Sequence, residues 1–134
     1  MGHAAFKIDQ MGNLGAFMLA MSFFMVTACD PCENEGPAEH KSPDGAWKVV
    51  VFERGCGATV GPNVQMSVLP SSKPLPNGAG NAFVIDSNHG ASALQYVYVD
   101  WTSNNSVRIT YPSNARVAKQ ERRVGSVDVT YVSK

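Results

Sequence analysis

The chain has 134 residues, of which 11 are Lys or Arg and 11 are Asp or Glu, so its formal net charge is zero. A balanced charge gives no global attraction to a phosphate backbone, and nucleic acid is therefore not an expected partner. The length allows one domain and excludes a large multidomain enzyme.

An uncharged apolar run, from Leu14 to Ala28, stands near the start of the chain. At about fifteen residues it is too short to cross a bilayer comfortably, and its length is typical of a signal-peptide core. A buried helix is the alternative. Such a helix should carry polar residues along one face, but the run has only Ser22 and Thr27. The run therefore predicts a signal peptide over residues 1–28.

The end of the run is a branched apolar residue, two small residues and a cysteine, Val26-Thr27-Ala28-Cys29. This tetrapeptide resembles the lipobox of bacterial lipoprotein precursors. The resemblance implies that Cys29 is lipidated and becomes the first residue of a membrane-anchored protein, which faces the periplasm or the cell exterior. Asp30 resembles the retention signal of enteric bacteria and slightly favours the inner membrane. An ordinary cleaved signal followed by a coincidental cysteine is the alternative.

The chain has three cysteines, an odd number for an exported protein. If lipid occupies Cys29, then Cys32 and Cys56 remain as a pair and are a candidate disulfide in an oxidising envelope. The bridge would close a loop of about 25 residues, which the chain-entropy relation values at roughly 3.5 kcal/mol. Two unpaired thiols are the alternative. No metal site is expected, because no second Cys-x-x-Cys and no His pair at ligand spacing occurs.

Residues 29–43 are acidic and carry almost nothing to bury, which predicts a tether. Ser42-Pro43-Asp44-Gly45 then predicts a turn, because Pro presets φ, Asp binds nearby backbone and Gly accepts a positive φ. The β-domain is expected over residues 44–134, with a first strand at 46–53.

Further strands are indicated by short β-branched and aromatic segments bounded by turn residues. The expected strands are 46–53, 63–69, 82–85, 94–101, 106–111, 115–119 and 125–132. About seven strands and no helical periodicity after Cys29 predict an all-β fold, a small antiparallel sandwich or barrel. The last three or four strands are expected to form a meander, because their connections are short.

The expected core consists of the apolar residues that alternate along these strands. They are Val49, Val51, Val64, Val68, Val97, Val99, Val107, Ile109, Val127 and Val129.

A second resemblance covers most of the part after Cys29. It is carried by Ser42–Thr59, Pro76–Asn81, Asn88–Gly90 and Val107–Pro112. These segments are similar to a group of small uncharacterised bacterial exported proteins that share a strand ending in a Cys-Gly-Ala-Thr turn. The resemblance supports one exported domain and implies no catalytic residue.

Tyr96 and Tyr98 are the first candidates for a binding surface, since alternation puts them opposite two inward-facing valines. Arg108 and His89 complete the expected surface. Core packing is the usual role of aromatic residues on strands, and it remains the alternative for both tyrosines.

A hydrolase-type site is the catalytic alternative. It would use the Asp86–His89 loop with Ser87 or Ser92 as the nucleophile. The sequence has no Gly-x-Ser-x-Gly elbow, and neighbouring loop residues rarely point at one another, so capping of a turn is the more typical role for His89.

The sequence therefore predicts a membrane-anchored, non-enzymatic lipoprotein whose β-domain binds another envelope protein or a glycan. No cofactor is expected. A hydrolase and a purely structural envelope protein are the alternative functions.

Overall fold

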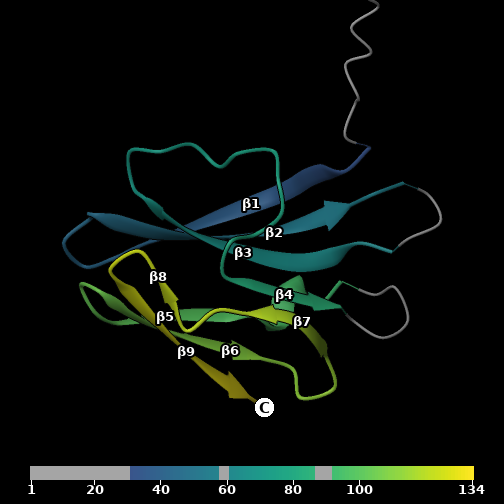
Figure 1. Ribbon diagram of the computed structural model, residues 1–134. Coiled ribbons are helices and arrows are strands. Elements are labelled where there is room, and N and C mark those ends of the chain that lie inside the picture. The colour runs from purple at the N-terminus through teal and green to yellow at the C-terminus, as the bar shows by residue number, and fades with distance from the viewer. Residues whose placement is uncertain (1–30, 58–60, 87–91) are drawn as a thin grey trace, which may run out of the picture.

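The computed structural model describes residues 31–57, 61–86 and 92–134, and it shows two β-sheets stacked face to face (Figure 1). The predicted signal peptide, Cys29 and Asp30 lie outside the described residues. The strands are β1 (Glu33–Lys41), β2 (Trp47–Gly55), β3 (Asn63–Pro70), β4 (Phe83–Asp86), β5 (Tyr98–Ser103), β6 (Ser106–Tyr111), β7 (Arg116–Gln120), β8 (Arg123–Val124) and β9 (Val127–Ser133), with one 3₁₀ turn η1 (Leu94–Tyr96) before β5. The all-β sandwich is confirmed.

The first sheet has the order β1-β2-β3-β4-β7, and the second has the order β5-β6-β9-β8. These remain two separate layers, so the sandwich is formed rather than the barrel. Every neighbouring pair is antiparallel except β6 and β9, which run parallel.

The predicted acidic tether is wrong over most of its length, because residues 33–41 form β1. This strand pairs antiparallel with β2 along its whole length and is the exposed edge of the first sheet. Its charged residues, with Pro37 and Gly36, gave no apolar pattern to detect, since an edge strand can be held by backbone hydrogen bonds alone. The folded domain therefore begins before residue 44.

The turn between β1 and β2 has the predicted chemistry. Asp44 Oδ1 accepts hydrogen bonds from the hydroxyl of Ser42, at 2.7 Å, and from the backbone N–H of Ala46, at 3.1 Å. These bonds favour the ionised carboxylate and lower the pKa of Asp44. Gly45 has a φ of 72°, as the turn requires.

A one-residue bulge in β1 sets the register of the cysteines. The pairing with β2 shifts between Glu35 and Ala38, where Gly36 has a φ of 59°. Beyond the bulge Glu33 faces Gly55, so one further step along the pair places Cys32 across from Cys56. The two cysteines form a disulfide, as predicted.

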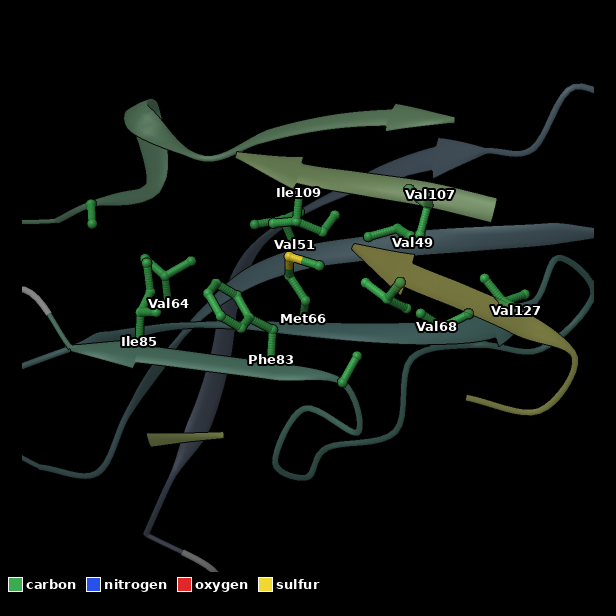
Figure 2. Packing of buried hydrophobic residues seen from close by; sticks show 13 residues of the cluster. Val49, Val51, Val64, Met66, Val68, Phe83, Ile85, Val107, Ile109 and Val127 are labelled. Carbon is green, nitrogen blue, oxygen red and sulfur yellow. The ribbon is translucent and has the colours of Figure 1, made fainter. Parts of the chain in front are cut away.

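Side chains from both sheets fill the interior (Figure 2). Eight of the ten expected core residues are buried, and Val97 and Val99 are half-buried and pack against the same cluster. The largest additions to the expected core are Met66, Phe83 and Ile85, all fully buried.

The outer face of the first sheet is also covered over its central strands, β2 and β3. Val50 and Phe52 are fully buried on β2, although they point away from the sheet interface. The connection from Ser71 to Asn81 arches over this face (Figure 1). It is fastened where the backbone N–H of Gly80 donates to the side-chain oxygen of Gln65 at 2.6 Å.

Two buried cations of β2 take their partners from β1. Lys48 Nζ lies 2.6 Å from Glu39 Oε1, and the Arg54 guanidinium donates to Asn34 Oδ1 at 2.7 Å. Lys48 and Arg54 are at most 6% exposed to solvent. The polar groups of β1 therefore offset the desolvation cost of burying these two charges.

The expected meander at the end of the chain is wrong. After β6 the chain crosses to the first sheet, where β7 pairs with β4, and it then returns so that β9 lies parallel to β6. Parallel neighbours need a connection of about a dozen residues or more, and the segment 112–126 provides it. The short spacing of the strands could not show this change of sheet.

Gly80→Ala should destabilise the domain by about 1–3 kcal/mol, because an added Cβ would lie 2.6 Å from the carbonyl oxygen of Met66. Gly78→Ala is the matched control in the same loop, since its Cβ would meet no atom within 4 Å. Urea unfolding of both variants measures the difference. Equal free energies of unfolding would show that the loop does not press on β3.

Removal of the disulfide by a Cys32→Ser, Cys56→Ser double substitution should lower the free energy of unfolding by about 3 kcal/mol, since the bridge closes a loop with a sequence separation of 24. The wild type with its disulfide reduced should unfold at the same urea concentration as the double variant. Two reactive thiols at these positions in unfolded, unreduced protein would mean that the bridge does not form.

Candidate functional site

The two candidate tyrosines lie where the chain enters the second sheet. Tyr96 ends the 3₁₀ turn η1, where its backbone N–H donates to the carbonyl of Ala93 at 3.0 Å, and Tyr98 begins β5. Ala93 is buried and fixes the turn against the core, so both tyrosines point outward. Their exposed fractions are 54% and 62%, which agrees with the exposure expected from the alternation.

Both tyrosines line one hollow on the second sheet, with a volume of about 420 Å³. Thr110 lies directly across from Tyr98 on β6, and Pro112 follows the end of that strand. Lys134, which follows β9, provides the positively charged side chain of the wall. We name this hollow the tyrosine pocket, lined by Tyr96, Tyr98, Thr110, Tyr111, Pro112 and Lys134.

Tyr111 forms the inner wall of the tyrosine pocket. Its ring contacts Phe83 of the other sheet in an edge-to-face arrangement, with the ring centroids 5.1 Å apart. Aromatic pairs of this geometry contribute about 0.5–1.5 kcal/mol beyond burial. The pocket wall is therefore supported directly by the core.

Arg108 shares the outer face of β6 with Thr110 but is not part of the pocket wall. It faces Asp100 on β5, with 3.6 Å between the guanidinium nitrogen and the carboxylate oxygen, and both side chains are about half exposed or more. An exposed pair of this kind contributes little to stability. The fourth expected residue, His89, lies outside the described residues.

The described members of the hydrolase alternative each have a structural partner. Asp86 forms an ion pair with Arg116, its neighbour on β7. The Ser92 hydroxyl is hydrogen-bonded to the Glu53 carboxylate and accepts the backbone N–H of Leu94. Ser87 and His89 fall outside the described residues, so the structure does not bring this set together.

Two further features bear on the site. Within residues 31–57, 61–86 and 92–134, no group of three or more His, Cys, Asp or Glu side chains could hold a metal ion. Across the same ranges, no helix has the length and apolar character needed to span a bilayer.

Four residues of the tyrosine pocket were not expected from the sequence. Thr110, Tyr111 and Pro112 lie on or just after β6, which the short β5–β6 hairpin places beside Tyr98. Lys134 follows β9, whose parallel pairing with β6 is non-local, so no local pattern could connect it with Tyr98. The termination of a strand by Pro112 was the one usable signal, and it marked only the end of β6.

Comparison of the chain with protein-family models, with curated proteins and with solved structures finds no match.

A separate tyrosine has a shifted pKa for a structural reason. The single hydroxyl proton of Tyr131 on β9 is shared between the carbonyl oxygens of Glu121, at 2.6 Å, and Ala82, at 3.2 Å. Burial raises the pKa of Tyr131, with a further contribution from the negative charge of Glu121. The hydroxyl is a clamp between the two sheets and not a group set up for proton transfer at neutral pH.

Tyr131→Phe should lower the free energy of unfolding by about 1 kcal/mol at pH 7, since the hydroxyl loses its two acceptors. Because the pKa of Tyr131 is raised by folding, the stabilisation is fully present below pH 10, its ordinary pKa, and is lost as the pH rises above it. Urea unfolding from pH 7 to pH 11 should show the difference between the two proteins narrowing.

Tyr98→Phe is the control, because its exposed hydroxyl should leave the free energy of unfolding unchanged at neutral pH. A difference between wild type and Tyr131→Phe that stays constant up to pH 11 would contradict the clamp.

Proposed function

We propose that the chain is a lipoprotein of the bacterial cell envelope, held to a membrane through lipid on Cys29, and that its β-domain binds an envelope protein or a glycan at the tyrosine pocket. The observation that carries the binding role is the outward placement of Tyr96 and Tyr98 around one hollow. Single exposed aromatic residues are ordinary, but two that share a concave surface with a supported wall are typical of a binding site.

The disulfide supports a position close to the membrane. Cys32 is three residues from Cys29, within roughly 10 Å along an extended chain, and it is bonded to the end of β2. The domain would therefore stay next to its anchor. Glu53, near the end of β2, contacts Ser92 just before η1, so the tyrosine pocket begins at this same end of the sandwich.

A photo-crosslinking amino acid at position 98 tests the proposal in intact cells. Position 117 is the matched control, because Val117 is also an exposed apolar residue but lies on β7 of the other sheet. We expect a discrete crosslinked product at position 98, reduced by Tyr96→Ala, and none at position 117. Products that are identical at both positions would contradict a binding site at the pocket.

The anchor has its own test. Mass spectrometry of the membrane-extracted wild type should show a chain that begins at a lipidated Cys29, and Cys29→Ala should accumulate as unprocessed precursor. A soluble, lipid-free wild type would contradict the anchor and leave the binding site unaffected.

A further inference from the structure

The tyrosine pocket presents flat aromatic faces together with hydroxyl groups. Among the described residues, Tyr96, Tyr98 and Val117 are the large apolar residues with high exposure, and the two tyrosines share the pocket. A tyrosine ring offers a rigid apolar face at low entropic cost, and its hydroxyl forms hydrogen bonds at the rim. A pyranose ring has the complementary surface, because its C–H groups form an apolar face and its hydroxyls surround it.

The charge in the pocket comes from Lys134. Its backbone is fixed at the end of β6, since its N–H donates to the carbonyl of Tyr111 at 3.0 Å and its carbonyl accepts the N–H of Ser113 at 2.8 Å. The residues that line the pocket include no Asp or Glu. No acidic side chain of the wall therefore competes for the ammonium group.

The size of the pocket distinguishes between classes of ligand. Its volume of about 420 Å³ falls in the range of small-molecule sites, about 300–1,000 Å³. A stable protein interface buries roughly 800 Å² on each partner and would have to extend well beyond the six residues of this hollow. Recognition of an anionic lipid surface uses clusters of about 4–8 cations, and the pocket has one lysine.

We propose that the tyrosine pocket binds a pyranose ring that bears a carboxylate. The rings of Tyr96 and Tyr98 stack on the sugar, the hydroxyl of Thr110 contacts the sugar hydroxyls, and Lys134 pairs with the carboxylate. This proposal rests on the proposed function and selects an acidic glycan as the ligand class.

Isothermal titration of the full chain in detergent tests the proposal with two tetrasaccharides of equal length. The hyaluronan tetrasaccharide alternates glucuronate with N-acetylglucosamine, whereas chitotetraose contains only neutral N-acetylglucosamine. Because Lys134 is exposed, we expect the acidic tetrasaccharide to bind up to about fivefold more tightly, the difference that one exposed ion pair can supply.

Three variants assign the contacts. Tyr96→Ala and Tyr98→Ala should each weaken both tetrasaccharides by about tenfold, while Lys134→Gln should weaken only the acidic one and bring the two affinities together. Val117→Ala is the matched control and should bind as the wild type does. Each variant should unfold at the same temperature as the wild type, which would show that weaker binding comes from the lost contact and not from a damaged fold.

Specific outcomes would contradict the binding of an acidic sugar at the tyrosine pocket. Equal affinity of the wild type for the two tetrasaccharides, or binding of neither, contradicts it. A photo-crosslinking residue at position 98 can also be tested in phosphatidylglycerol vesicles with the tetrasaccharide present. A covalent product with lipid would assign the pocket to the membrane instead. A protein crosslinked at position 98 without saccharide binding would overturn this proposal while leaving the proposed function in place.

Discussion

The crossing of β7 from one sheet to the other is the constraint on which the tyrosine pocket depends. Because β7 pairs with β4, the chain must return before it forms β9, and it arrives parallel to β6. The two strands therefore end side by side, with Tyr111 across from Ser133 and Lys134 one residue beyond. In an antiparallel meander β9 would end at the opposite end of β6. Lys134 could not then have lined the same pocket as Tyr98.

The hairpin of β1 and β2 imposes a second constraint, at the end where the chain would leave its anchor. The extra residue at Gly36 shifts the pairing by one, and without that shift Cys32 would face Gly57 rather than Cys56. The bulge therefore sets the register that the disulfide requires. The exposed edge of β1 also carries charges, a proline and a bulge, which are the features that keep an edge strand from pairing with other chains.

The sequence predicted elements whose stability comes from a one-sided apolar pattern. The bounds of β6 agreed fully and those of β3 to within one residue, and the same alternation placed Tyr98 on the outer face. The apolar alternation failed to predict β1. The stability of this strand comes from backbone pairing, buried cations and a disulfide, and none of these leaves a local pattern in the sequence. The alternation also missed the buried outer face of β2, because burial of Phe52 depends on a loop that begins about twenty residues later. The topology and the place of Lys134 in the pocket wall depend on non-local pairing, which periodicity does not show.

Under the proposed function, the two sheets divide stability from binding. At β2 and β3 the first sheet is covered on both faces, by the core on one side and by the loop over Phe52 on the other, so the residues of these two strands are committed to packing. The second sheet contributes its inner face to the same core and leaves its outer face to solvent. Exposed tyrosines on that face can change with little loss of stability. Tyr111 is different, because its ring contacts Phe83 and also lines the tyrosine pocket, so it couples the shape of the pocket to the packing of the core.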